Sequence, residues 1–448
     1  MKFVKIVVAM LLVLFAQPAV PLNAQSDMPI ILSMRERAEM RDTWLTIRLN
    51  TVVPELLRRE NIDMWIIIAR EYNEDPVIKT MLPAKWLAAR RRTILVFHDS
   101  GPEKGVERLA VARYDIGEFF NNAWDKEKQP DQWQRLAEVI EERDPQRIAL
   151  NYSETFALAD GITHSEFEAF RSAVPQKYLH RIVSGERLAI GWLETRTQEE
   201  IVVYATICRI AHRIIAEGLS DKVVQPTVIT TDDVEWWYRE RIRELKLVTW
   251  FHPSVSVQRA EEPGRSGSFA ARPESQTIMP GDLIHVDFGI TYLGLNTDTQ
   301  QHAYVLKPGE NDAPEGLKRA LAIGNRLQDI LNSNFVVGRT GNEILAISLE
   351  QAKTEGIKPT IYTHPIGFHG HGAGPTIGLW DQQDGVPGKG DYELFYNTAH
   401  SNELNVNVAI PEWDNKEIRI MLEEDIIFTE EGVRFIDGRQ AELHLIPR

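Results

Sequence analysis

Residues 281–298 read GDLIHVDFGITYLGLNTD, and the chain is organised around this stretch. An apolar run with β-branched residues, a glycine-containing turn and a second strand-like run predict a β-hairpin. With Tyr292 and Leu293 as the turn residues, Asp287 and Asp298 lie directly opposite each other. Like charges at opposed positions destabilise a pair of strands. We therefore expect either two solvated surface aspartates or a carboxylate pair held together by a shared proton or a divalent cation.

Length and composition predict an ordinary globular protein of more than one domain. The 448 residues exceed what one hydrophobic core usually serves, and 43% of them are hydrophobic and 26% charged. The formal net charge is −15 and no cluster of Lys and Arg reverses it locally, so we expect no nucleic-acid partner. Cys208 is the only cysteine, so no internal disulfide is possible.

The N-terminus has the layout of a secretory signal peptide. Two lysines precede the apolar run 6–16, which is too short to span a bilayer comfortably, and a Pro-containing segment then ends in Leu22-Asn23-Ala24, where we expect cleavage. No later stretch is apolar enough to cross a membrane. We expect residues 1–24 to be removed and the mature protein, beginning near Gln25, to be secreted or periplasmic and free of the membrane. An uncleaved N-terminal anchor is the alternative.

The remaining chain is predicted to form two domains. Residues 25–187 combine apolar runs typical of strands buried on both faces with helical patterns, as in an α/β domain. Residues 188–448 begin with helical periodicity and end in mainly strand-like sequence. In this second half the pattern predicts helices at about 198–214, 232–245, 315–333 and 341–355.

Three histidines fall within eight residues of one glycine-rich segment: His364, His369 and His371. One isolated histidine is more often a packing residue. Three together favour a metal or catalytic site, because imidazole is the commonest metal ligand. His285 shares a strand face with Asp287, and there a supporting or packing role is more expected than ligation.

Two further acidic residues, Glu403 and Glu423, lie in strand-like apolar sequence. Buried carboxylates are costly unless they are paired or bind a metal. Glu424 is an alternative to Glu423, but strand alternation favours Glu423, which shares a face with Arg419.

Together these residues form an ordered pattern: Asp, a second Asp eleven residues later, His in H-x-x-G-x-x-x-H, then two strand Glu. The pattern resembles the creatinase/methionine-aminopeptidase-like ("pita-bread") metallopeptidases, family M24, and within it Xaa-Pro aminopeptidase and prolidase. The resemblance is close from about residue 190 onward and looser before it. It implies an α/β creatinase/prolidase-like domain over 25–187. An α+β pita-bread catalytic domain with a curved, mostly antiparallel sheet and flanking helices would follow over 188–448.

The resemblance also implies a site. Two divalent ions, manganese first and cobalt, zinc or iron as other options, would be bound by five residues: Asp287, Asp298, His364, Glu403 and Glu423. Four carboxylates and a neutral imidazole carry a charge of −4, which two such ions neutralise. Glu403 would also be the general base and His371 would stabilise the tetrahedral intermediate. His369 has no counterpart in the family pattern; it would orient a neighbour, or take the catalytic role in place of His371 if the loop is shifted. His369 and Arg419 are also weak candidates for substrate contacts.

The implied function is that of an exported, dinuclear-metal-dependent peptidase, an Xaa-Pro aminopeptidase or dipeptidase in which a metal-bridging hydroxide attacks the peptide bond. The resemblance suggests a homodimer. Three positions depart from the family pattern: Glu403 is not followed by Pro-Gly, Gln301 stands where Arg is common, and Ala270 stands near the usual position of a His. These departures concern substrate contacts. Alternatives are a metal-dependent lyase or amidinohydrolase acting on a non-peptide small molecule, or a non-catalytic peptide-binding module.

Overall fold

The computed structural model describes residues 28–261 and 274–447, and the part from Ile31 onward forms one compact unit. The predicted signal peptide, residues 1–24, lies outside the described residues. In the described part of the chain, no helix combines the length and the apolar character needed to cross a bilayer.

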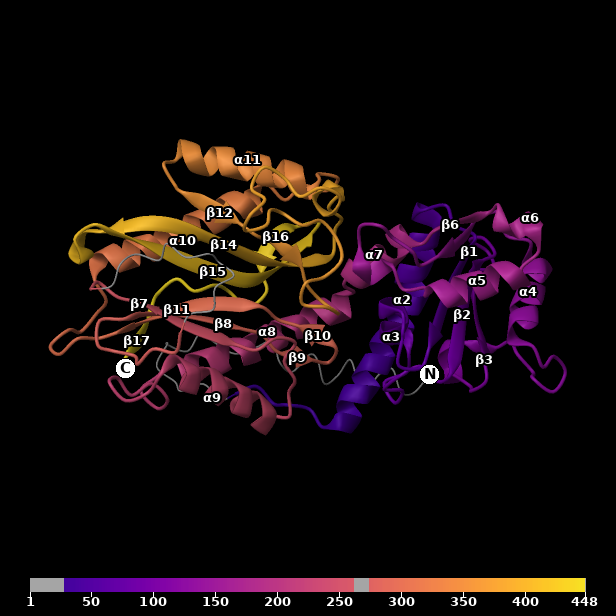
Figure 1. The fold of residues 1–448 in the computed structure, drawn as a ribbon, viewed down its shortest axis with the longest axis horizontal. Coiled ribbons are helices and arrows are strands. Elements are labelled where there is room, and N and C mark those ends of the chain that lie inside the picture. Colours follow the sequence, from indigo (N-terminus) through magenta and orange to yellow (C-terminus); the bar gives the residue numbers. More distant parts are fainter. Residues whose placement is uncertain (1–27, 262–273, 448) are drawn as a thin grey trace. The chain divides into compact units, whose positions relative to one another are not determined.

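The first half of this unit is built on a six-stranded mixed sheet (Figure 1). The central strand β1 pairs antiparallel with β2 and parallel with β5. In spatial order the strands are β4 (Asn121–Asn122), β3 (Val106–Ala112), β2 (Arg92–Asp99), β1 (Met64–Arg70), β5 (Ile148–Leu150) and β6 (Ile182–Ser184).

Helices cover both faces of this sheet, which explains the continuous apolar runs of its strands. Trp65 and Ile67 of β1 pack in one cluster with α2 (Met34–Arg59), α3 (Pro76–Met81) and α7 (Glu186–Glu194). The alternate residues Met64, Ile66 and Ile68 pack in another with α4 (Gln132–Arg143), α5 (His164–Ala173) and α6 (Gln176–Leu179). The predicted domain boundary, between residues 187 and 188, falls within α7 and stays a prediction.

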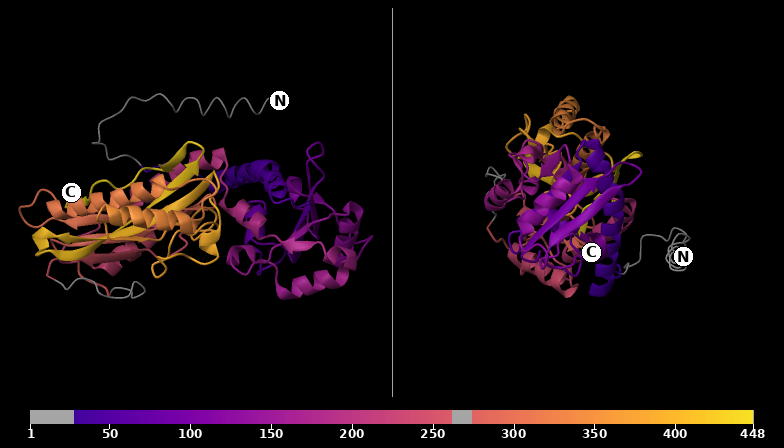
Figure 2. Two further views of the ribbon diagram at one scale, coloured as in Figure 1. Left: turned by 90° about the horizontal axis from the view of Figure 1, so that it is seen from above. Right: turned by 90° about the vertical axis from the view of Figure 1, so that its right-hand side faces the viewer.

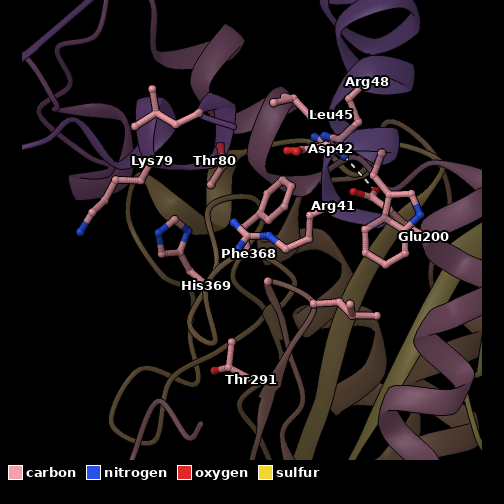
Figure 3. A pocket seen from close by; sticks show the side chains of 14 residues that line it. Arg41, Asp42, Leu45, Arg48, Lys79, Thr80, Glu200, Thr291, Phe368 and His369 are labelled. Carbon is pink, nitrogen blue, oxygen red and sulfur yellow. Dashed lines mark hydrogen bonds and ion pairs between the residues drawn. The ribbon is translucent and has the colours of Figure 1, made fainter. Parts of the chain in front are cut away.

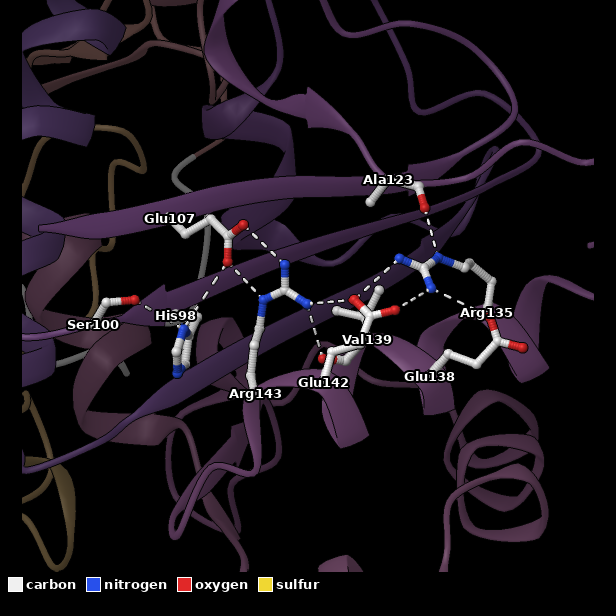
Figure 4. A network of polar contacts seen from close by, with 9 residues as sticks. All are labelled: His98, Ser100, Glu107, Ala123, Arg135, Glu138, Val139, Glu142 and Arg143. Carbon is white, nitrogen blue, oxygen red and sulfur yellow. Dashed lines mark hydrogen bonds and ion pairs between the residues drawn. The ribbon is translucent and has the colours of Figure 1, made fainter. Parts of the chain in front are cut away.

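A polar network ties the outer side of α4 to β3 (Figure 4). The guanidinium of Arg143 donates to both carboxylate oxygens of Glu107, at 2.6 and 2.8 Å, and to Glu142 at 3.1 Å. Arg135 donates to the same Glu142 at 2.7 Å. Because these carboxylates are largely in contact with water, each pair contributes only about 0–1 kcal/mol. The network orients the helix more than it stabilises the fold.

The second half is built on a nine-stranded, mainly antiparallel sheet. Its main path runs β12 (Pro359–Ile361), β14 (Thr398–Ile410), β15 (Lys416–Thr429), β11 (Thr299–Val305), β8 (Leu283–Phe288) and β7 (Ser254–Gln258). Three strands lie off this path: β13 (His364–Pro365) pairs with β14, β16 (Gly432–Phe435) with β15, and β17 (His444–Ile446) with β11. Figure 2 shows the long strands β14 and β15, in yellow, running beside one another.

Four helices accompany this sheet: α8 (Gln198–Gly218), α9 (Thr231–Glu244), α10 (Glu315–Ser333) and α11 (Gly341–Thr354). Capping boxes at Thr197 and Thr340 fix the starts of α8 and α11. The helices α10 and α11 share an apolar core with Leu404 and Leu422, which project from one face of β14 and β15. Because side chains alternate along a strand, Glu403 and Glu423 project from the other face.

The hairpin expected from residues 281–298 is present, but the predicted register is wrong. The short strands β9 (Thr291–Tyr292) and β10 (Leu295–Asn296) place Leu293 and Gly294 in the turn. Both have positive φ, 58° and 85°, as a type I′ turn requires, and glycine favours that turn. Asp287 consequently pairs with Gln300 rather than with Asp298. The two aspartates are diagonal neighbours, which still lie on the same face of the sheet.

Gly289 lies opposite Asp298 in this register, at the break between β8 and β9, and leaves no room for a side chain. A Cβ at this position would come within 2.3 Å of the Thr297 carbonyl oxygen and 2.7 Å of the Phe251 ring. The closest of these atoms belongs to the backbone of the opposite strand and cannot turn aside. The close approach of the two strands beside Asp298 therefore depends on glycine.

We predict that Gly289→Ala destabilises the protein by about 1–3 kcal/mol, the usual cost of overfilling a packed site. Chemical denaturation monitored by circular dichroism measures the change in the free energy of unfolding. An unchanged denaturation midpoint would contradict the close packing described for this position.

Candidate metal centre

Four polar side chains form a row across four strands of the second sheet. Glu403 on β14 pairs with Glu423 on β15, Glu423 with Gln300 on β11, and Gln300 with Asp287 on β8. Directly paired residues of antiparallel strands project from the same face. The sheet register therefore brings Asp287 beside Glu403 and Glu423, which follow it by more than a hundred residues in the sequence.

The other two predicted ligands, Asp298 and His364, lie at the edges of this row. Asp298 precedes β11, and its backbone N–H lies 3.4 Å from each carboxylate oxygen of Asp425. His364 on β13 pairs with Ser401, two residues before Glu403. Their side chains reach the row, as the distances between ligand atoms show.

Three overlapping groups of ligand atoms fall within 4.8 Å of one another. The groups are Asp287 with Asp298 and Glu423, His364 with Glu403 and Glu423, and Asp298 with His364 and His371. All five predicted metal ligands and the predicted catalytic His371 therefore belong to one cluster. Asp298, His364 and Glu423 each belong to two of the groups, so these three side chains occupy the middle of the cluster.

Electrostatics make this cluster unfavourable without a cation. Burial raises the pKa of Asp287, Asp298 and Glu403 well above the usual range, and the neighbouring Glu423 carboxylate raises each further. Among the described residues, the ion pairs of these carboxylates involve only His364, at 3.5–4.0 Å. Oδ1 of Asp287 and Nε2 of His364 are buried without a hydrogen-bond partner. Buried atoms of this kind, all oxygen or imidazole nitrogen, suit divalent manganese, iron, cobalt or zinc.

His371 stands at the rim of the cluster among aromatic rings. Its ring centroid lies 4.6 Å from that of His364, 5.2 Å from Trp250 and 6.0 Å from Tyr362. Partial burial and the nearby His364 lower the pKa of His371 to about 4. The imidazole is consequently neutral at pH 7 and carries one N–H that can donate to a substrate oxygen.

His369 lies apart from these three groups. It lines a pocket of about 270 Å³, together with the basic side chains Arg41 and Lys79 and the hairpin residue Thr291 (Figure 3). Partial burial, together with the positive charges of Arg196 and Lys79, lowers the pKa of His369 to about 4. A contact between His369 and substrate stays a prediction, and this pocket is where such a contact would be made.

Phe368, next to His369, joins the histidine segment to the first half of the protein. Its ring contacts two guanidinium groups, with its centroid 4.8 Å from that of Arg48 on α2 and 4.4 Å from that of Arg196. Both arginines are buried, and Arg48 donates to Glu200 at 2.9 Å. Contacts between cations and an aromatic face are strongest where water is excluded. The segment that carries His364 and His371 is thus anchored to α2.

The structure decides between Glu423 and Glu424 as the last predicted ligand. Glu424 projects away from the cluster. It accepts a hydrogen bond from Gln301 at 3.0 Å, and Nε2 of His212 lies 2.7 Å from its other carboxylate oxygen. Glu423 is therefore the glutamate that lies with the other ligands. Arg419 is four residues before Glu423 on β15, and its backbone exchanges two hydrogen bonds with the Gln258 side chain. It belongs to none of the three groups, and its substrate contact stays a prediction.

Gln300 is a member of the row that the sequence interpretation missed. Its amide Nε2 lies 2.7 Å from Oε1 of Glu403 and 2.7 Å from Oε2 of Glu423. Its Oε1 accepts from Nε2 of His285 at 2.9 Å, so His285 contacts the glutamine and supports the cluster indirectly. The signal was present in the sequence, because a residue two positions after Asp298 on a strand shares its face.

We predict that Asp298→Asn lowers the amount of divalent metal bound per protein molecule and abolishes activity. The substitution removes one of the two carboxylates that belong to two groups of the cluster, and it changes the side-chain volume very little. Metal content after dialysis, measured by inductively coupled plasma mass spectrometry, tests this. Asp75→Asn, which changes a buried carboxylate in the first half of the chain, away from the cluster, is the matched control. Wild-type metal content in Asp298→Asn would exclude this residue as a ligand.

Comparisons with known proteins agree with this geometry. The model of metallopeptidase family M24 matches residues 204–434, more than half of the chain, and this range includes the whole cluster. A search of curated protein sequences finds no significant match.

Solved structures share the fold at low sequence identity. An X-Pro aminopeptidase from Thermotoga maritima is 17% identical with a TM-score of 0.60, covering 87% of this chain and 99% of its own. An Xaa-Pro dipeptidase from Bacillus anthracis is 16% identical with a TM-score of 0.58, covering 92% and 100%. The N-terminal domain of the FACT complex subunit SPT16 from Eremothecium gossypii is 14% identical with a TM-score of 0.57, covering 92% and 98%.

These likenesses confirm the predicted fold class, an α/β domain followed by a pita-bread domain, and at such identities they show the fold alone. The family match supports a metallopeptidase that acts on peptides, and family M24 uses divalent metals. The chain belongs to metallopeptidase family M24.

Proposed function

We propose that this chain is an exported peptidase with a dinuclear metal centre and Xaa-Pro aminopeptidase or dipeptidase activity. The observation that carries the proposal is a cluster on one face of the second sheet, made by His364, the half-buried Asp287 and the buried carboxylates of Asp298, Glu403 and Glu423. A peptide-binding module would have no need of so much uncompensated buried charge. The printed names of the Thermotoga and Bacillus neighbours support the choice of Xaa-Pro substrates.

In this proposal five residues hold two ions, manganese first and cobalt, zinc or iron as other options: Asp287, Asp298, His364, Glu403 and Glu423. When bound, such ions polarise a carbonyl group and lower the pKa of water. Two overlapping groups of three ligands, joined through Glu423, support two positions in preference to one. Two divalent charges would also offset the four negative charges of the cluster.

The proposed roles of the remaining groups follow from their protonation and position. Glu403 accepts the proton of the attacking water, because it is a buried carboxylate beside the cluster. Neutral His371 donates its N–H to the carbonyl oxygen of the scissile bond as negative charge develops there. The rings of Trp250 and Tyr362 beside His371 offer an apolar surface that suits a proline ring. Arg41 and Lys79 in the pocket of His369 suit the carboxylate of a short peptide.

We predict that metal-depleted protein regains hydrolysis of Xaa-Pro dipeptides or Xaa-Pro-Yaa tripeptides when Mn²⁺ is added. Released amino acids, quantified by mass spectrometry, measure the activity. Matched Xaa-Ala peptides are the control for proline specificity, and Asp298→Asn is the control for a contaminating peptidase. A fully metallated protein that is inert towards these peptides and a broad peptide panel would reject the peptidase proposal.

A second candidate function is action on a non-peptide small molecule, as a metal-dependent lyase or amidinohydrolase. Its support is the position three residues after Asp298, where Gln301 stands in place of a family arginine and turns to Glu424 instead of the cluster. A non-catalytic binding role is a third possibility in this fold, given the SPT16 neighbour. Metal content distinguishes the non-catalytic binding role from the two enzymatic functions. The peptide panel distinguishes the peptidase from the lyase or amidinohydrolase.

Export and self-association complete the proposal. We predict that protein produced in a secreting host begins at Gln25, because the small residue Ala24 directly precedes it and a basic segment and an apolar run lie upstream. Intact-mass spectrometry of the protein recovered outside the cytoplasm measures this directly. A mass that includes residues 1–24 would show that the N-terminus is retained as an anchor.

A homodimer is proposed by resemblance, and its mass in solution is measured by light scattering.

A further inference from the structure

Gln300 lies at the centre of the row of ligands without being one of them. It occupies β11 between Asp287 on β8 and Glu423 on β15, and only 3% of its surface is exposed. A buried amide needs partners for its two N–H groups and its carbonyl oxygen. The identity of those partners indicates its role.

The amide nitrogen of Gln300 divides its two hydrogens between two predicted ligands. Nε2 is 2.7 Å from Oε1 of Glu403 and 2.7 Å from Oε2 of Glu423. The opposite orientation of the amide would place its oxygen against two carboxylate oxygens, which is repulsive. The amide can therefore be assigned from its surroundings, with nitrogen towards the glutamates.

His285 fixes the other end of the same amide. Its Nε2 is 2.9 Å from Oε1 of Gln300, and because that oxygen only accepts, the imidazole donates. His285 is 7% exposed and sits on the neighbouring strand β8. A chain of donors therefore runs from His285 through Gln300 to Glu403 and Glu423.

A neutral donor is suited to this position. An arginine or lysine would also bind the two carboxylates, but its positive charge would compete with a bound cation. An amide restricts the rotation of both carboxylates and leaves their charge available. Ser401 acts similarly on Glu423, donating from Oγ to Oε1 at 2.6 Å. Both oxygens of Glu423 are thus held by neutral groups.

We propose that Gln300 is a positioning residue of the metal centre, which fixes Glu403 and Glu423 in the orientation that binds metal, and that His285 acts through it. The inference rests on the proposed function, since it assumes that the cluster holds divalent ions. Groups that orient metal ligands in this way typically contribute 10–100-fold to metal affinity.

The chain supplies a closely matched control. Gln301 is the next residue of β11, is also buried, and also donates to a glutamate, Glu424, at 3.0 Å. Its side chain projects from the opposite face of the strand. Gln300→Met and Gln301→Met therefore remove the same amide from the same strand, and only the first change touches the cluster.

The experiment titrates metal-free full-length protein with Mn²⁺ by isothermal calorimetry. We expect Gln300→Met to raise the dissociation constant of at least one Mn²⁺ about 10–100-fold, and Gln301→Met to leave it unchanged. Substituting Co²⁺ provides a spectroscopic signature, because its visible absorption depends on ligand geometry. That spectrum should change in Gln300→Met and not in Gln301→Met.

A double-mutant cycle tests the role of His285. His285→Phe should weaken Mn²⁺ binding in the wild-type background and have no further effect in Gln300→Met, because its action passes through the amide. Additive effects of the two substitutions would overturn the role given to His285. If Gln300→Met does not fold, His285→Phe alone carries the test, and wild-type affinity in that variant overturns the inference.

The outcomes separate this inference from the proposed function. Wild-type protein that binds Mn²⁺, with equal affinity in Gln300→Met, overturns the role of Gln300 and leaves the metal centre intact. Equal weakening in Gln300→Met and Gln301→Met assigns the effect to the stability of β11 and also overturns it. Wild-type protein that binds no Mn²⁺ overturns the metal centre, and this inference with it.

Discussion

The repulsion among four carboxylates buried on one sheet face is the constraint on which the rest of the site depends. Asp287, Asp298, Glu403 and Glu423 lie within a few ångströms of one another and away from water. In such surroundings an unpaired charge is costly, and a protein retains several only where a partner of opposite charge compensates them. The ion pairs described for these groups involve a single imidazole, that of His364. A divalent cation of the kind that family M24 uses would supply the compensation.

The surroundings of the cluster are arranged to hold these carboxylates without neutralising them. The donors that contact Glu403 and Glu423 are an amide and a hydroxyl, from Gln300 and Ser401. Burial opposes charge of either sign, and it lowers the pKa of both His371 and His369 to about 4. His302, which follows Gln300 on the same face of β11, has its pKa lowered to about 4 by burial. A cation entering the cluster meets carboxylate oxygen atoms that neutral donors already orient.

Much of this arrangement could be predicted from sequence, because it follows from residue type and strand alternation. The choice of Glu423 over Glu424 is an example. Strand alternation puts Glu424 on the same face as the apolar residues Ile420 and Leu422, and Glu423 on the opposite face. The register of the hairpin could not be predicted correctly, because two adjacent turns are compatible with the residues 291–294. Positive φ at Leu293 and Gly294 selects one of them. Gln300 was overlooked for a different reason: a neutral side chain gives no charge signal, and its importance comes from neighbours on other strands. The separation of His369 from His371 likewise depends on how one short segment turns.

The contacts of Phe368 with two buried guanidinium groups have a consequence for separating the first half of the chain from the second. Arg48 belongs to a helix packed on the first sheet, whereas Phe368 lies between two histidines of the metal-binding face. If the first half were removed, the ring would lose one of its two cationic neighbours, and the histidine segment would be free to sample other conformations. The shared ring connects the two halves mechanically, so that the first sheet supports the sheet that carries the carboxylate cluster. If the first half were exchanged for that of a relative, the relative's first half would need an arginine at the position of Arg48 in α2 to keep this contact.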